Sequence, residues 1–306
     1  MIESSNLQFK FSGISLIIIA TFLLSIRSIL VKLAYIEQID VLDLFYLRFL
    51  ITVPLLLFFA FYKSKNDLFT KICDQKILFS CCLAGFFGYY LATLSDFYSL
   101  KMIKANINRI ILYTFPIYVI IWNCFISKKL PTKANLITFL IIQICLLFVL
   151  GGFNIDFGSS NLLGIYLALI AAISYSIYIV INQQIGKKLG SILFTTYAVT
   201  ISFIFLNIHF FLIGQYSNMS FNISVNGYII IITMAVFCTF LPLLLISEGI
   251  KQIGATRFSM LNTSGPVITI TLCYFILNET MGFIQIISSL IIILTLFIAE
   301  KRKLSR

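Results

Sequence analysis

Ten long apolar stretches run through this chain, and they limit its possible folds more strictly than any other feature. About 20 mostly apolar residues cross the hydrocarbon core of a bilayer as a helix. Stretches of this kind occur at 12–35, 42–62, 77–100, 105–126, 134–153, 162–185, 191–214, 227–250, 255–277 and 282–299. Only 11% of the 306 residues are charged, against about a quarter in an average soluble domain. We therefore predict an all-α polytopic membrane protein with ten transmembrane helices.

The basic residues are distributed unevenly between the two sides of such a bundle. If the N-terminus is cytoplasmic, the inner segments hold 15 basic residues, whereas the outer segments hold only Lys101 and Lys104. An excess of Lys and Arg marks the cytoplasmic side of a membrane protein. The net charge of +11 thus indicates orientation and contact with anionic lipid headgroups, not nucleic-acid binding. We expect a multi-pass protein of the cytoplasmic (inner) membrane with both termini in the cytoplasm.

The chain resembles itself at an offset of 150 residues. Over the 35 positions from 96 to 130, seven residues are identical at this offset, and Pro116 falls on Pro266. The offset places the first five predicted spans on the last five, and because five is odd the two halves must run in opposite directions. Inverted repeats of this kind are typical of secondary transporters, which bind substrate between the halves. We predict two five-helix repeats, at residues 1–153 and 154–306.

Several residues of these repeats resemble a known family. The connection Ala105-Asn106 followed by Pro116, and the segments 253–256, Gly265-Pro266 and 277–282 of the second copy, are similar to the EamA family of the drug/metabolite transporter superfamily. Lys32 and Arg48 also stand where that family often has basic residues. The resemblance implies a carrier for small metabolites. Some related carriers transport purine-bearing substrates such as S-adenosylmethionine.

Five basic residues lie on predicted spans: Arg27, Lys32, Arg48, Arg109 and Arg257. A charge at bilayer depth costs about 2.5–3.5 kcal/mol on insertion scales, so it normally faces a partner or water. Buried arginine beside tyrosine would suit an anionic, zwitterionic or heteroaromatic cargo. The predicted substrate-binding residues are Arg27, Arg48, Tyr89, Tyr90, Tyr113, Tyr175, Tyr178 and Asn262. Structural roles, such as packing or snorkelling to the interface, are the alternative for each.

Two acidic residues occupy corresponding helix ends in the two halves. Asp96 lies near the outer end of the third span, and Glu248 lies near the inner end of the eighth. Arg109 and Arg257 begin the fourth and ninth spans. We expect Asp96 with Arg109, and Glu248 with Arg257, to form gates that close alternately; static ion pairs are the alternative.

The sequence offers little for catalysis. It has one histidine and neither an HExxH nor a GxSxG pattern, and its seven cysteines follow no metal-ligand spacing. We expect no catalytic residues, no metal and no cofactor. The prediction is a secondary transporter, monomeric or homodimeric, that moves a small metabolite by alternating access: amino-acid-like, zwitterionic or nucleoside-type. A membrane-embedded enzyme or a channel-like membrane protein is the alternative.

Overall fold

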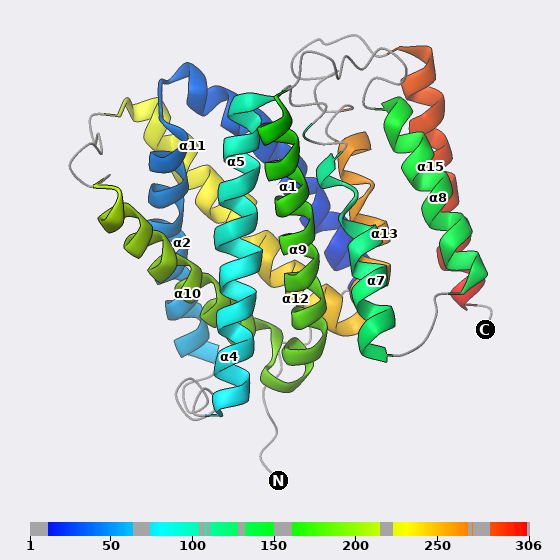
Figure 1. Ribbon diagram of the computed structural model, residues 1–306, viewed down its shortest axis with the longest axis horizontal. Coiled ribbons are helices and arrows are strands. Elements are labelled where there is room, and N and C mark those ends of the chain that lie inside the picture. The colour runs from blue at the N-terminus through cyan, green and yellow to red at the C-terminus, as the bar shows by residue number, and fades with distance from the viewer. Residues whose placement is uncertain are drawn as a thin grey trace.

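Helices build the described part of the protein (Figure 1). The computed structural model describes residues 12–63, 74–103, 108, 111–127, 132–149, 161–214, 223–268, 271 and 282–304. Its α-helices are α1 (Gly13–Ile36), α2 (Val41–Lys63), α4 (Gln75–Ala84), α5 (Ala92–Met102), α7 (Phe115–Ser127), α8 (Lys133–Val149), α9 (Leu162–Leu189), α10 (Ser191–Leu212), α11 (Val225–Ala235), α12 (Leu241–Ile253), α13 (Ala255–Asn262) and α15 (Phe283–Leu304). Two π-helical segments, η2 (Gly85–Leu91) and η5 (Val236–Phe240), join α4 to α5 and α11 to α12.

The helices coincide with the predicted spans wherever the structure describes them. Five helical stretches are long and apolar enough to cross a membrane: Leu42–Lys63, Gln75–Ser99, Leu162–Leu189, Ser191–Leu212 and Val225–Ile253. Four shorter apolar helices are Gly13–Arg27, Phe115–Ile126, Leu136–Phe148 and Phe283–Ile298. Parts of the predicted spans 105–126 and 255–277 lie outside the described residues, as does the predicted boundary between the halves. The helical membrane fold is thus confirmed, and the count of ten stays a prediction.

Equivalent helix contacts recur at the offset of the repeat. A Cβ added to Gly13, at the start of α1, would lie 2.7 Å from Cγ2 of Ile253 at the end of α12. A Cβ added to Gly164, near the start of α9, would lie 2.7 Å from Cγ2 of Ile103 at the end of α5. These pairs are related by 150 or 151 residues. A glycine at the start of the first helix of each half therefore allows close packing against the other half: α1 packs against the end of α12, and α9 packs against the end of α5.

Local irregularities follow the same offset. The π-helical segments η2 and η5 occupy corresponding places in the third helix of each half, and such wide turns are rare in ordinary helices. Two turns then interrupt corresponding helices directly before Pro116 and Pro266. The Thr114 hydroxyl donates to the Ile111 carbonyl (2.6 Å), as that of Ser264 does to the Leu261 carbonyl (2.8 Å). A two-repeat fold accounts for all of these matches.

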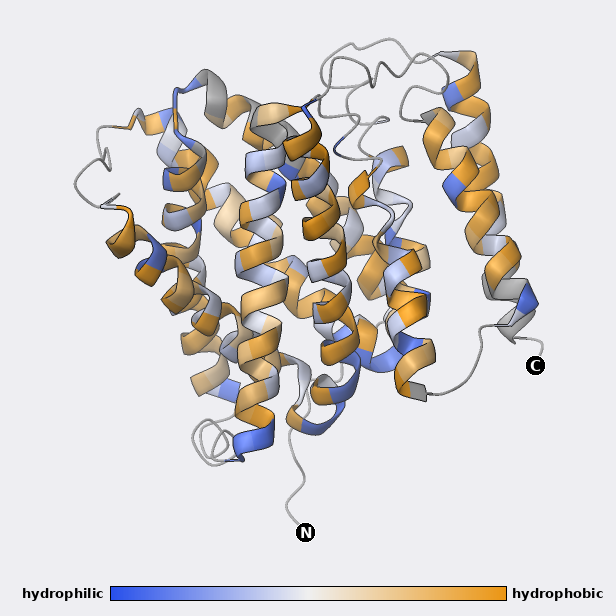
Figure 2. Ribbon diagram, viewed as in Figure 1, coloured by the Kyte–Doolittle hydropathy of each residue, from blue (hydrophilic) through white to orange (hydrophobic). Residues whose placement is uncertain are grey.

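Polar residues lie at one end of the bundle and apolar residues cover its sides, as expected for a protein embedded in a membrane. Figure 2 shows hydrophilic segments gathered at the end of the bundle where α4 begins and where α9 and α12 end. Lysines occupy the last turns of α2, α9 and α12. Large apolar side chains such as Phe58, Phe125 and Phe297 are exposed on the sides. Lipid chains would cover these side chains in a bilayer.

The helices α8 and α15 lie side by side at the edge of the bundle (Figure 1). Their inward faces pack on the rest through Phe139, Cys145 and Ile292, which contact Ile120 and Val267. The core itself forms between α2, η2, α5, α9, α10 and α12. The buried polar residues described next lie mainly on these helices and on α1, η5 and α13.

Candidate functional site

Arg48 is buried among aromatic rings in the middle of the bundle. Its side chain, on α2, is 3% exposed. The guanidinium carbon lies 5.4 Å, 5.2 Å and 5.9 Å from the ring centroids of Phe45, Phe49 and Phe97. Phe45 and Phe49 come from the same helix, one turn before and one residue after Arg48, whereas Phe97 comes from α5. Cation–π contacts of this kind stabilise a desolvated arginine, but the Nε atom of Arg48 has no hydrogen-bond partner.

Arg27 approaches the same group of rings from α1. Its guanidinium carbon lies 5.6 Å from the centroid of Phe97, the ring that also contacts Arg48. The two arginines are close enough for their charges to repel each other. The thiol of Cys238, on η5, lies within electrostatic reach of both. The tertiary structure thus brings two positive charges from different helices to one apolar place, whereas the sequence predicted a buried position for each separately.

Three of the predicted tyrosines form one cluster next to Arg27. The Tyr89 hydroxyl on η2 donates to the Tyr178 hydroxyl on α9 at 2.6 Å, and Tyr175 stacks on Tyr178 with centroids 5.8 Å apart. The Tyr175 hydroxyl lies within electrostatic reach of Arg27. Tyr89 and Tyr178 belong to different halves of the chain, so this cluster lies where the halves meet.

Tyr113 and Asn262 lie around the two helix interruptions. The Tyr113 hydroxyl packs against Gly265, where an added Cβ would lie 2.5 Å away. The Asn262 side-chain oxygen accepts a hydrogen bond from Thr21 of α1 at 3.1 Å, and Ser25 of α1 donates to the Gly265 carbonyl at 3.2 Å. Asn262 therefore contacts α1, the helix that carries Arg27, and Tyr113 packs against Gly265, whose carbonyl also binds α1.

Tyr90 occupies a separate place. Its ring contacts Phe205 and His209 on α10, with centroids 6.0 Å apart in each case. Because neighbouring residues on a helix point in different directions, Tyr89 and Tyr90 cannot both join the cluster on α9. The structure brings Tyr89 to the other tyrosines and leaves Tyr90 with α10.

Removing the Tyr178 hydroxyl should lower stability. This fully buried hydroxyl accepts hydrogen bonds from Tyr89 and, at 3.1 Å, from the Asn182 side-chain amide. Tyr178→Phe leaves two donors without their partner, at about 1–3 kcal/mol for a buried unsatisfied group. Thermal unfolding in detergent should show a lower midpoint than for the control Tyr175→Phe, whose ring is held by aromatic contacts. Equal midpoints for the two variants would contradict this role of Tyr178.

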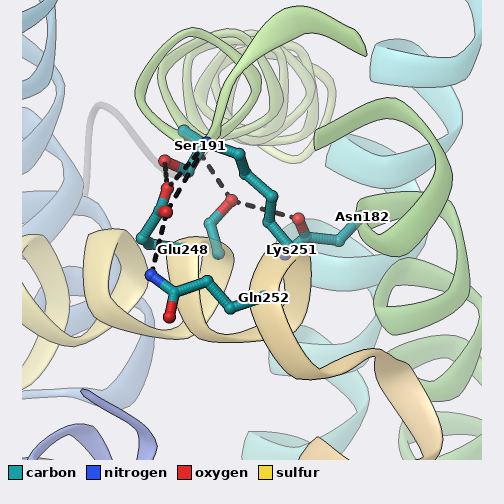
Figure 3. Close-up of polar contacts among 6 residues, drawn as sticks. Asn182, Ser191, Glu248, Lys251 and Gln252 are labelled. Atoms are coloured by element: carbon teal, nitrogen blue, oxygen red, sulfur yellow. Dashed lines mark hydrogen bonds and ion pairs between the residues drawn. The ribbon is translucent and has the colours of Figure 1, made fainter. Parts of the chain in front are cut away.

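Glu248 forms a second polar cluster, at the end of the bundle that carries the lysines. Figure 3 shows its carboxylate, on α12, directed at Ser191 at the start of α10. It accepts hydrogen bonds from the Ser191 hydroxyl (2.5 Å) and the Gln252 amide (3.1 Å), and it pairs with Lys251 (3.3 Å). The turn that sets Ser191 in place contains Gly190, with φ +90°. Side-chain-bearing residues rarely adopt that conformation.

Hydrogen bonds connect the Glu248 cluster with the tyrosines. The Ser247 hydroxyl donates to the Asn182 side-chain oxygen at 3.0 Å and lies 3.3 Å from the Ser191 carbonyl. Asn182 in turn donates to Tyr178. These contacts are buried, and a fully satisfied polar network of this kind holds its members in one arrangement. These hydrogen bonds therefore join α12 to α9 and to the tyrosine cluster.

The other predicted gate residues are placed only in part. Asp96, on α5, is buried, and one of its carboxylate oxygens has no hydrogen-bond partner. Arg109 lies outside the described residues. Arg257 is half-buried on α13, while the ion pair that the structure records for Glu248 is with Lys251. The pairings with Arg109 and Arg257 stay predictions. Within the described ranges, no three His, Cys, Asp or Glu side chains gather as a metal site would require.

Sequence reasoning missed the residues that surround the buried charges. Phe97, Cys238, Asn182, Ser191 and Ser247 were not singled out, because phenylalanine and small polar residues are common in membrane helices and carry no signal alone. The i−3 spacing of Phe45 from Arg48 was the one local hint, since residues three apart share a helix face. The other contacts join distant parts of the chain.

The fold and the buried polar groups together define a polytopic helical membrane protein built like a transporter. The chain belongs to the EamA-like transporter family, whose pattern matches residues 11–151 and again 162–300. This confirms the resemblance seen in the sequence. Family membership indicates membrane transport of a small molecule.

Individual relatives agree with this assignment. An uncharacterized transporter of Bacillus subtilis (strain 168), YcbK, is 28% identical over 290 residues, which cover 93% of this chain and 91% of that protein. An uncharacterized transporter of Archaeoglobus fulgidus is 23% identical over 268 residues, covering 87% and 90%. A crystal structure with a TM-score of 0.74 covers 96% of this chain and 99% of its own at 15% identity. That structural likeness concerns the fold alone.

Proposed function

We propose that this protein is a secondary carrier that moves a small metabolite across the cytoplasmic membrane by alternating access. The observation that carries the proposal is the meeting of Arg27 and Arg48 at the ring of Phe97. Next to it lies the tyrosine cluster, in which Tyr89 and Tyr178 join the two halves. Carriers built from inverted repeats bind their substrate at such a junction near the midplane. Charges are placed at this depth only when they serve a partner or a path.

The orientation follows from the lysines. Those in the last turns of α2, α9 and α12 belong to the end of the bundle that we assign to the cytoplasm. The Glu248 cluster then lies on the cytoplasmic side, as an inner gate whose contacts hold α12 against α10. Asp96 occupies the corresponding outer end. Cargo of the amino-acid-like, zwitterionic or nucleoside type, S-adenosylmethionine included, suits arginine and tyrosine side chains.

A counterflow assay in proteoliposomes tests the proposed carrier function. Vesicles that contain purified protein and an unlabelled metabolite inside should take up the same labelled metabolite faster than empty vesicles, and uptake should saturate. A carrier exchanges its two facing states with cargo bound, which produces both effects. A panel of amino acids, nucleosides and S-adenosylmethionine serves as probes, and vesicles without protein serve as the control. Uptake that rises linearly with concentration and ignores the internal metabolite would instead support a channel.

A further inference from the structure

The guanidinium of Arg48 lacks the partners that a buried arginine normally has. Arginine carries five N–H donors, yet within the described part of the chain Arg48 forms no ion pair, and its buried Nε has no hydrogen-bond partner. The phenylalanine rings around it offer π faces and no acceptor oxygen. A buried donor without an acceptor is costly, and the cation–π contacts offset only part of this cost. A bound group that supplied the acceptor would remove the rest.

The positive charge of Arg27 increases the tendency of Arg48 to bind an anion. Arg27 repels Arg48, and both guanidinium carbons lie within 6 Å of the centroid of one ring, Phe97. Among the described residues, no ion pair joins Arg48 to the buried carboxylates of Asp43 or Asp96. Like charges in apolar surroundings attract an anion strongly, because little water screens them. Arg48 is therefore a buried cation whose surroundings are made more positive by Arg27.

Depth excludes the ordinary alternative of snorkelling. Arg48 lies about 10 Å along α2 from Val41, and Arg27 about 13 Å along α1 from Ile36, at a rise of 1.5 Å per residue. Both side chains are directed at Phe97, in the interior, and not at the helix ends. The two arginines are therefore retained inside the bundle for a purpose other than interfacial anchoring.

We infer that Arg48, together with Arg27, binds an oxyanion group of the cargo, a carboxylate or a phosphate. The planar guanidinium fork matches the oxygens of both groups through two parallel hydrogen bonds. The rings of Phe45, Phe49 and Phe97 surround Arg48 with apolar groups that offer no competing acceptor oxygen. This inference rests on the proposed carrier function and narrows its substrate class to metabolites with an anionic group.

Cys238 provides a local probe of this site, because its thiol lies within reach of both arginines. The experiment uses full-length protein in proteoliposomes, with Cys238 as the remaining cysteine after the others are replaced by alanine. Labelling is followed with two methanethiosulfonate reagents, the anionic sulfonatoethyl compound and the cationic trimethylammonioethyl compound. The positive site should concentrate the anionic reagent and raise its relative rate by about ten-fold.

Substitutions at position 48 separate charge from structure. Arg48→Gln should abolish the preference for the anionic reagent without slowing the cationic one, and Arg48→Lys should retain most of it. Lys187→Gln, which removes a charge from the exposed end of α9, is the matched control and should change neither rate. If Arg48→Gln slows both reagents equally, or if neither reagent ever labels Cys238, the inference is wrong.

Competing anions identify the group that binds. Acetate and inorganic phosphate are added separately during labelling, with chloride as the control. Protection by acetate indicates a carboxylate and protection by phosphate indicates a phosphate ester, while protection by neither contradicts an oxyanion site. Counterflow separates this result from the proposed function: anion-selective labelling without counterflow overturns the carrier, and counterflow without anion-selective labelling overturns only the oxyanion site.

Discussion

Gly88→Ala should markedly lower the stability of the protein, because the added methyl group has no space to occupy. A Cβ at this position of η2 would lie 2.5 Å from both Cβ and Cγ of Tyr178. Real Cβ atoms do not approach other atoms so closely, and Tyr178 is fully buried and hydrogen-bonded to Tyr89 and Asn182. The helices η2 and α9 must therefore separate. Overpacking of this kind costs about 1–3 kcal/mol, and occasionally more.

The measurement is thermal unfolding of the purified variant in detergent, followed by the loss of the monodisperse peak in size-exclusion chromatography. Gly282→Ala is the matched control, because the methyl group added before α15 would meet only the Gln285 side-chain oxygen, at 3.6 Å. We expect a clearly lower midpoint for Gly88→Ala and a nearly unchanged one for Gly282→Ala. Identical midpoints would show that η2 and α9 are not in close contact.

In the carrier that we propose, Glu248→Gln should shift the equilibrium towards the inward-facing state. The carboxylate accepts hydrogen bonds from Ser191 and Gln252 and pairs with Lys251, and a neutral amide can neither pair with the lysine nor accept at both positions. Hydrogen bonds to charged groups contribute about 1.5–3 kcal/mol. Each 1.4 kcal/mol corresponds to about a ten-fold change in an equilibrium constant. Weakening the hydrogen bond to Ser191, which joins α12 to α10, should open the cytoplasmic side of the proposed carrier.

Accessibility of single cysteines from each side of the membrane measures this shift. Cysteines introduced on the cytoplasmic side should react faster in Glu248→Gln, and those on the outer side more slowly. Asp96→Asn, at the corresponding outer end, should produce the opposite bias, and Lys187→Gln should produce none. An unchanged pattern in both acidic variants would mean that these residues form static contacts and not gates.

The repeat illustrates how far sequence reasoning reaches. Seven identities in 35 positions are weak in so apolar a chain. The offset of 150 nevertheless relates the helix interruptions before Pro116 and Pro266, and it relates the glycine contacts of Gly13 and Gly164 to within one residue. The signal survives because glycine and proline act on the backbone of their own segment. The π-helical segments at the same offset were not predicted, since they have no clear residue signature.

The candidate site was predictable as a set of residue types and not as an arrangement. Arg27, Arg48 and the tyrosines stood out because charged and polar groups are costly inside a membrane. Which of them meet depends on the rotation of each helix about its axis, and this is why Tyr89 joins Tyr178 while Tyr90 contacts α10. Glu248 was identified, but its hydrogen bond with Ser191 depends on a turn at Gly190 that joins two separate helices.

The sequence by itself determined the helical membrane fold and the family, because the length of an apolar stretch, the basic residues in its connections and the positions of glycine and proline are local properties of the chain. The tertiary structure alone decided that Arg48 and Arg27 share the ring of Phe97, and that Glu248 is connected through Ser247 and Asn182 to the tyrosines. Such contacts join residues far apart in sequence. They arise when all the helices pack together, and the apolar pattern of a lipid-embedded helix does not specify which of its faces meets which neighbour.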